Sequence, residues 1–273
     1  MARPQVFIGS GELSRLERKV LTHSLRRNTA REVDIWVLNG THNSIERNDE
    51  QPFPAPMSLA LKYRNYTEFS LYRYLIPELC NYHGRAIYLD SDMICLSDIG
   101  ELFDTPMNAA DFLATRHYDE QEWGTSVMLI DCERCRFDLN RIYDEIDSGH
   151  YTYPDFSRMS PRFLEHHPYK IGPLDPNWNV FDRHDRNTKL IHYTNLLTQP
   201  WRRTGHPYGR LWFQYLDEAV EAGIVTEDDF HLGIMRGAAR PSVRDGNSAT
   251  GILIRRGRRF SKAVARRLKL LFS

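Results

Sequence analysis

Residues 5–11 read Gln-Val-Phe-Ile-Gly-Ser-Gly, and residues 33–38 read Val-Asp-Ile-Trp-Val-Leu. Both are short apolar runs that end at small or turn-forming residues, which is typical of buried strands. Apolar positions recur at helical spacing between the two runs, at Leu13, Leu16, Val20, Leu21 and Leu25. This order of strand, helix and strand predicts the opening of a parallel, doubly wound α/β sheet.

The rest of the chain continues the same pattern. Apolar runs predict further strands at 86–89, 111–115, 126–131 and 189–193, and helical spacing predicts helices over 69–79, 140–147 and 208–222. Residues 43–58 and 151–160 are too polar or irregular to predict regular structure. With no internal repeat, we expect one α/β domain over residues 1–236, followed by a linker and tail over 237–273.

Composition narrows the class of protein. The 273 residues include 36 basic and 36 acidic side chains, and 41% are hydrophobic, which is enough for a sizeable core. No apolar run reaches the length of about 20 residues that a membrane-spanning helix needs. A basic field over the whole chain is absent, so nucleic acid is not an expected partner.

The four cysteines do not make a disulfide framework for a chain of this length. The residues that follow Met1 show no apolar stretch of the kind that a signal peptide carries. We therefore expect a reduced, cytoplasmic setting.

The charge is unevenly distributed. Residues 255–273 hold eight basic side chains and no acidic one, so the rest of this neutral chain carries eight more acids than bases. Residues 260–272 also place four apolar side chains at helical spacing: Phe260, Val264, Leu268 and Leu271. A basic amphipathic helix suits an anionic membrane surface, whereas a solvated helix, a disordered tail and a helix docked on the acidic body are the alternatives. The first interpretation predicts peripheral attachment at the inner face of the membrane.

Asp90-Ser91-Asp92 is the sharpest chemical feature. It follows the apolar run Ile87-Tyr88-Leu89, so a buried strand would deliver two carboxylates to the edge of the sheet where open α/β folds bind ligands. Hard carboxylate oxygens suit Mg²⁺ or Mn²⁺ and leave coordination places for phosphate oxygens. A surface turn after a strand is the alternative, because Asp and Ser are common turn formers.

His192 is the second feature, within the apolar stretch Leu190-Ile191-His192-Tyr193. A single histidine in such a stretch is often a core residue with a hydrogen-bond partner. However, the polar run that follows it, from Thr194 to Gln199, could offer donors to a phosphate. From the residues alone, both interpretations of His192 stay open.

Together these features resemble a family. The pieces are Phe7-Ile8-Gly9, the run Glu68-Phe69-Ser70-Leu71-Tyr72-Arg73-Tyr74-Leu75-Ile76-Pro77-Glu78-Leu79, Ala86-Ile87-Tyr88-Leu89-Asp90-Ser91-Asp92, Ser126-Val127-Met128-Leu129-Ile130-Asp131, Asn177-Trp178-Asn179, Ile191-His192-Tyr193 and Gln199-Pro200-Trp201. In this order, over residues 5–202, the chain resembles the retaining, metal-dependent glycosyltransferases of family eight or a close sister group. The resemblance implies a GT-A fold, which is a Rossmann-like mixed sheet flanked by helices.

The resemblance also implies site residues. Asp90, Asp92 and His192 match the family's ligands for Mn²⁺ (or Mg²⁺), which holds a nucleotide-diphosphate sugar. Donor-binding positions are implied at Ile8, Gly9, Arg73, Ser91, Ser126, Thr194, Gln199 and Trp201. The family's acidic pair before the Trp-Asn element is missing, so Asp155 and Glu165, the nearest acids, are the catalytic candidates. The implied reaction moves a sugar, from UDP by expectation, to a carbohydrate or lipid-linked acceptor.

Two other functions fit parts of the sequence. A phosphohydrolase of the haloacid dehalogenase type also places Asp-X-Asp after a strand, with the first Asp as nucleophile. A non-catalytic nucleotide-sugar binding protein is the other alternative, because Gln199 stands where the family commonly has lysine. Incubation with Mn²⁺ and a panel of nucleotide sugars would separate the three functions.

Overall fold

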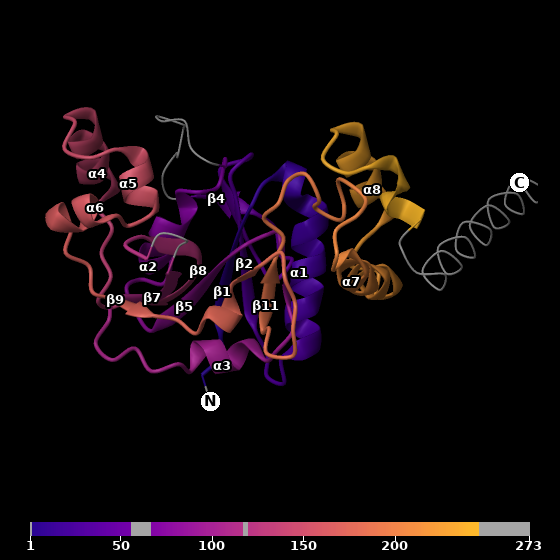
Figure 1. Cartoon of the computed structure of the whole chain (residues 1–273), viewed down its shortest axis with the longest axis horizontal. Coiled ribbons are helices and arrows are strands. Elements are labelled where there is room, and N and C mark those ends of the chain that lie inside the picture. The colour runs from indigo at the N-terminus through magenta and orange to yellow at the C-terminus, as the bar shows by residue number, and fades with distance from the viewer. Residues whose placement is uncertain (1, 56–66, 117–119, 246–273) are drawn as a thin grey trace, which may run out of the picture. The chain divides into compact units, whose positions relative to one another are not determined.

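The structure is a computed structural model, and it describes residues 2–55, 67–116 and 120–245. The chain divides into two compact units, Met1–His192 and Tyr193–Ser273. Figure 1 labels the elements of both units. Among the described residues, none of the helices combines the length and the apolar character needed to cross a bilayer.

The first unit is built on an eight-stranded mixed sheet with the strand order β4-β3-β2-β1-β5-β8-β7-β9. Strand β1 runs parallel to both β2 and β5, whereas β8 is antiparallel to β5 and β7. The strands are β1 (Gln5–Ser10), β2 (Asp34–Asn39), β3 (Ser44–Arg47), β4 (Phe53–Pro54), β5 (Arg85–Asp90), β7 (Phe112–Arg116), β8 (Trp123–Asp131) and β9 (Ile171–Pro173). The expected parallel βαβ opening and the mixed sheet are both confirmed.

A second, three-stranded sheet in the same unit has the order β10-β11-β6. Its strands are β6 (Met93–Cys95), β10 (Val180–Phe181) and β11 (Leu190–His192). The helices of the unit are η1 (Glu12–Ser14), α1 (Arg15–Asn28), η2 (Tyr72–Leu75), α2 (Ile76–Leu79), α3 (Ile99–Phe103), α4 (Leu139–Asp147), α5 (Tyr153–Ser157), α6 (Pro161–His166) and η3 (Pro176–Trp178). Figure 1 shows α4, α5 and α6 grouped together at one end of this unit.

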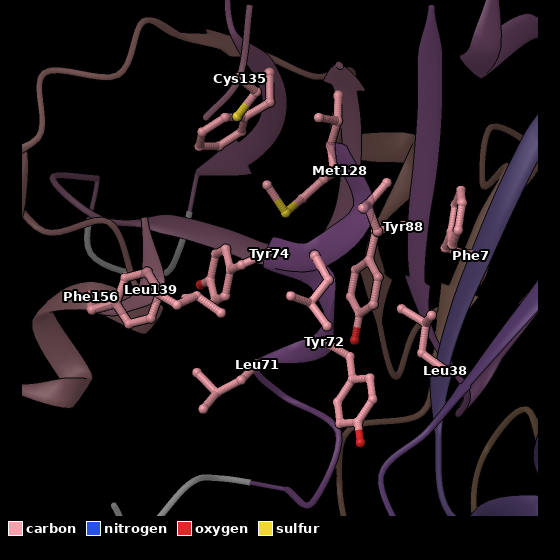
Figure 2. Packing of buried hydrophobic residues seen from close by; sticks show 14 of the residues in the cluster. Phe7, Leu38, Leu71, Tyr72, Tyr74, Tyr88, Met128, Cys135, Leu139 and Phe156 are labelled. Atoms are coloured by element: carbon pink, nitrogen blue, oxygen red, sulfur yellow. The ribbon is translucent and has the colours of Figure 1, made fainter. Parts of the chain in front are cut away.

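The large sheet separates two hydrophobic clusters, as the alternation of side chains along a strand requires. On β1, Phe7 belongs to one cluster while Val6 and Ile8 belong to the other. On β5, Tyr88 likewise faces the first cluster and Leu89 the second. Figure 2 shows Tyr88 inside the first cluster, together with Phe7 and Met128 from the neighbouring strands.

Three local predictions were wrong. Residues 43–55 of the expected polar loop form β3 and β4, because Ile45 is fully buried and pairs with Leu38. The segment expected to be irregular contains α5, which Thr152 and Asp155 stabilise through a capping box. The helix expected over 69–79 begins only at Tyr72, as a 3₁₀ turn, and becomes α-helical at Ile76.

The second unit contains α7 (Gly209–Glu221), α8 (Glu227–Met235) and η4 (Pro241–Asp245). The helix predicted over 208–222 is thereby confirmed. Buried aromatic rings form its core, with Trp201 lying 5.3 Å from Trp212 and 6.2 Å from Tyr193 between ring centroids. The predicted basic tail lies outside the described residues, and the predicted domain boundary at residue 236 stays a prediction.

Candidate functional site

Strand β5 carries the first acidic residue of the site and a tyrosine that contacts it. Tyr88 and Asp90 are two residues apart and so point to the same side of the strand. The Tyr88 hydroxyl donates a 2.6 Å hydrogen bond to Asp90 Oδ1. Burial raises the pKa of Tyr88 well above its usual value, so this hydroxyl keeps the proton that it donates.

Gly9 makes room for this pair from the neighbouring strand. Gly9 is the register partner of Asp90 across the parallel β1–β5 pairing. A Cβ atom at Gly9 would lie 2.2 Å from the Tyr88 hydroxyl and 2.7 Å from the Phe69 ring. The absence of a side chain at Gly9 therefore lets Tyr88 reach Asp90.

Arg73 supplies an internal cation for Asp90. Its side chain is only 9% exposed, and its Nη2 lies 3.2 Å from Asp90 Oδ1. Its Nε donates to the Ser70 carbonyl at 2.9 Å, and its Nη1 donates to both the carbonyl and the hydroxyl of Thr125. The guanidinium also lies over the Tyr88 ring, 4.5 Å from the centroid. Arg73 is thus held by hydrogen bonds on every side of its planar group.

Burial and charge act in opposite directions on these groups. Burial disfavours the charged form of Arg73, but the neighbouring Tyr88 and Asp90 outweigh it and keep the pKa of Arg73 above its usual value. Burial also raises the pKa of Asp90, against the charges of Arg73 and His192, which favour the carboxylate.

His192 and Asp92 form the second contact of the site. Strand β11 pairs antiparallel with β6, and this pairing sets His192 opposite Met93. Its Nε2 consequently lies 2.9 Å from Asp92 Oδ1. Burial acts to lower the pKa of His192, but the charge and hydrogen bond of Asp92 outweigh it, so the pKa lies above the usual value. The imidazole is 5% exposed, and it has a specific partner on each ring nitrogen.

Asn179 is the partner of the other ring nitrogen. Its Oδ1 lies 3.0 Å from His192 Nδ1, while its Nδ2 donates to Thr115 Oγ1 at 3.2 Å and to Ser126 Oγ at 3.0 Å. Because the amide nitrogen has two acceptors, the amide oxygen accepts from His192, and Nδ1 carries a proton. Nε2 is then the nitrogen whose lone pair can face a metal ion.

The side chains that could coordinate a divalent cation suit it only in part. Asp92 and His192 bring an oxygen and a nitrogen ligand together, which Mn²⁺ accepts. Asp90 is turned toward Arg73 and Tyr88, and within the described ranges no three His, Cys, Asp or Glu side chains are grouped closely enough to hold a metal. Two of the three predicted ligands are therefore in contact, and the third lies beside them without completing a cluster.

Comparison with known proteins identifies the segment that carries most of this site. Residues 23–139 match the family model described as glycosyl transferase family 8. This segment of the chain is similar to glycosyl transferase family 8. The matched segment includes Arg73, Asp90, Asp92 and Ser126, whereas Asn179 and His192 follow it and join the site through the fold.

Solved structures show the fold of this chain. The galactosyltransferase LgtC, in a complex with donor and acceptor sugar analogs, is similar with a TM-score of 0.62 and 15% identity, over 84% of this chain and 99% of that one. The glycosyltransferase GlyE of Streptococcus pneumoniae TIGR4, in its apo form, gives a TM-score of 0.58 and 15% identity, over 82% and 64%. Both likenesses confirm the expected GT-A fold.

A curated relative from a plant covers less of the chain. Protein CDI of Arabidopsis thaliana is 24% identical over 179 residues, which is 56% of this chain and 65% of that protein. This chain therefore spans just under two thirds of the length of that relative.

Several predicted donor-binding residues lie in the core rather than on the surface. Ile8 is fully buried in the second hydrophobic cluster, and Ser91 is 2% exposed. Ser126 bonds to Asn179 as described. In the second unit, Gln199 donates to the Tyr193 carbonyl at 2.9 Å, and Trp201 is packed among the aromatic rings. Thr194 is half-buried in the same unit.

The two catalytic candidates occupy different surroundings. The Asp155 carboxylate accepts hydrogen bonds from Thr152 and Ser160, so it serves the start of α5 and the turn after it. Glu165 lies exposed on α6. Neither environment brings these carboxylates to the Asp92–His192 pair, and their catalytic role stays a prediction.

Sequence reasoning missed two residues of the site. Tyr88 could have been found, because its spacing of two from Asp90 places both on one face of a strand. Asn179 stood in the Asn-Trp-Asn element, but nothing local marks it as the partner of a histidine 13 residues later.

Proposed function

We propose that this glycosyltransferase domain moves a sugar from a nucleotide-diphosphate donor, a UDP-sugar with retention of configuration, to a carbohydrate or lipid-linked acceptor. We further propose that Mn²⁺ or Mg²⁺ serves the reaction, with Asp90, Asp92 and His192 as its ligands. The observation that carries this proposal is the 2.9 Å contact between Asp92 and His192 beside Asp90, in a chain whose residues 23–139 match a glycosyltransferase family model.

The residues around these ligands support the same arrangement. A divalent ion bound there would supply charge stabilisation to the leaving diphosphate. Asn179 holds the Nδ1 proton of His192 and so presents Nε2 toward Asp92. Arg73 offsets the charge of Asp90 while Thr125 and Ser70 fix its guanidinium. These contacts hold the ligand side chains in place. They also supply partners to charged and polar groups whose burial without partners would cost free energy.

The family match gives no support to the phosphohydrolase alternative. That alternative rested on Asp-X-Asp after a strand, and the segment that matches the glycosyltransferase family contains this stretch. The alternative of a binding protein without turnover is separated from a transferase by experiment.

The experiment incubates the whole chain with Mn²⁺ and a panel of UDP- and GDP-sugars, and it measures release of the free nucleoside diphosphate. We expect slow hydrolysis of one donor, lost on chelation and lost in Asp92→Asn. Asp144→Asn is the matched control, because Asp144 is an exposed carboxylate on α4. Binding of a donor without turnover by the wild type, with and without sugar acceptors, would contradict the proposal. Glu165→Gln in the same assay tests the predicted catalytic role.

We also propose that the basic tail binds an anionic membrane surface. The support is the sequence pattern of eight cations with an apolar stripe, since residues 246–273 lie outside the described part. The full chain should sediment with anionic liposomes at low salt and less so as salt rises, because screening acts over about 8 Å at physiological ionic strength. Equal sedimentation of a chain ending at Gly251 would eliminate the idea.

A further inference from the structure

The first unit contains a cavity of about 350 Å³ at the end of β7 and along β10. The residues that matter for its chemistry are Thr115, Arg116, Asn179, Phe181, Arg183 and Asp185. Its volume falls within the range of about 300–1,000 Å³ that small-ligand sites occupy. It is therefore large enough for a sugar ring with a substituent.

The cavity wall is continuous with the candidate metal-binding residues. Asn179 lines the cavity and bonds to Thr115 on one side and to His192 on the other. The Phe181 ring, also in the wall, lies edge-on to the His192 imidazole at 5.3 Å between centroids. A ligand in the cavity would consequently lie one side chain away from the Asp92–His192 pair that we assign to the metal ion.

Two arginines give the cavity its charge. Arg116 lies over the Trp123 ring, with Cζ 3.7 Å from the centroid, and this contact fixes its guanidinium. Within the described residues neither Arg116 nor Arg183 has a carboxylate partner. Each guanidinium carries five N–H donors, and this arrangement suits an oxyanion such as a carboxylate or a phosphate.

Among the described residues of the wall, Asp185 is the one carboxylate, and it is engaged in its own loop. Asp185 Oδ1 accepts from the backbone N–H of Asn187 at 2.8 Å and of Thr188 at 3.1 Å, and from the Thr188 hydroxyl at 3.2 Å. Asp185 is thereby directed to the turn that it closes rather than to Arg183. The two guanidinium groups outnumber this carboxylate, so the cavity favours an anion.

We propose that this cavity binds a saccharide that carries a carboxylate or a phosphate, with Arg116 and Arg183 contacting the anionic group and Phe181 contacting the sugar ring. The proposal rests on the proposed function and names the class of sugar that it uses. The anionic sugar could be the acceptor or the sugar that the donor transfers, and both supply the same chemistry to the cavity.

The first experiment measures binding to the full chain without donor or metal. The probes are methyl β-glucuronide and glucose 1-phosphate, with methyl β-glucoside as the neutral reference, and the method is titration calorimetry. We expect both anionic probes to bind more tightly than the reference, and Arg183→Gln or Arg116→Gln to weaken them by about tenfold or more. Arg186→Gln is the matched control, because Arg186 is an exposed arginine of the same loop that does not line the cavity.

Two results would overturn the inference. One is equal binding of the glucuronide and the glucoside, and the other is an equal loss in Arg186→Gln and Arg183→Gln. Thermal unfolding of each variant verifies that the fold is retained, and we expect little change because Arg183 is exposed.

Turnover assays distinguish the two sources of the anionic sugar. If Arg183→Gln impairs transfer to anionic acceptors but spares donor hydrolysis, the anion belongs to the acceptor. If it impairs hydrolysis of UDP-glucuronate but spares that of UDP-glucose, the anion belongs to the transferred sugar. Metal-dependent donor hydrolysis together with glucuronide binding that does not depend on Arg116 or Arg183 would overturn this inference and leave the proposed function standing. Arginine-dependent binding of the glucuronide without turnover of any donor would overturn the proposed function and leave the anion-binding cavity standing.

Discussion

Replacing Arg73 with methionine tests whether the guanidinium is the internal counter-ion of Asp90. Methionine keeps much of the apolar volume of the side chain but removes its hydrogen bonds to Ser70 and Thr125 and its contact with Asp90. The carboxylate of Asp90, 19% exposed, would then lack its cation. Removing one partner of a buried ion pair costs about 3–5 kcal/mol.

This free energy converts into a measurable change in melting temperature. For a unit of this size, 1 kcal/mol corresponds to about 2–4 °C, so Arg73→Met should lower the Tm by about 6–20 °C. The assay is thermal unfolding followed by circular dichroism at pH 7 in the presence of a chelator, which keeps metal binding out of the comparison. Arg26→Met is the control, because the exposed pair of Arg26 with Asp49 should contribute only about 0–1 kcal/mol.

The double variant Arg73→Met/Asp90→Asn makes the reasoning refutable. Removing the uncompensated charge as well should restore part of the lost stability, by about 1–3 kcal/mol of coupling free energy. A double variant no more stable than Arg73→Met would show that Arg73 acts through packing and its Thr125 contact, and that its charge does not serve Asp90. A single variant as stable as Arg26→Met would refute the burial argument altogether.

Three further predictions follow from individual contacts. Asn179→Ala should weaken Mn²⁺ binding by about 10–100-fold, measured by electron paramagnetic resonance of free Mn²⁺, because His192 loses the acceptor that fixes its tautomer; unchanged affinity would place Asn179 outside the site. Gly9→Ala should destabilise the chain by about 1–3 kcal/mol in urea, since its Cβ would displace the Tyr88 hydroxyl, whereas Gly223→Ala lacks such a neighbour and reports only the backbone cost of a positive φ. Burial alone would raise the pKa of Glu145, but hydrogen bonds from Tyr151, Arg141 and His167 outweigh it and set the pKa to about 2. The stabilisation from Glu145 is therefore fully present above the unfolded pKa near 4.5 and is lost as pH falls toward 2, so the Tm difference between wild type and Glu145→Gln, worth at most about 3 kcal/mol, should shrink over that interval. A difference that stays constant from pH 6 to pH 3 would contradict this assignment.

The sequence predicted those helices and strands whose apolar pattern extends over enough residues to be detected. Strands β1, β2, β5 and β8 each combine several consecutive apolar residues, and helices α1 and α7 span 14 and 13 residues. The two-residue strands β4 and β10 have no periodicity to detect, because their place is set by pairing with β3 and β11. Helix α5 was missed since its signal lies in the capping residues Thr152 and Asp155 rather than in an apolar face.

The candidate site likewise contains residues that the sequence predicts and contacts that it does not. Asp90 and Asp92 were found because both stand at the end of one strand. The partnership of His192 with Asn179 depends on how β10 and β11 lie together, which no local pattern encodes. Arg73 was expected to line the donor pocket, but its hydrogen bonds direct it to Asp90 and Thr125 within the protein.

The two carboxylates of Asp90-Ser91-Asp92 each have a partner of the protein's own, the Arg73 guanidinium for Asp90 and the His192 imidazole for Asp92. An arriving metal ion therefore meets carboxylates that already have partners within the protein, and it has to displace the guanidinium or the imidazole contact before it can bind. We expect the bare cation to bind weakly and its affinity to rise when a nucleoside diphosphate brings its own negative charge. Substrate and metal would then enter as one complex, and a chelated sample of the protein would stay folded and ready to be reloaded.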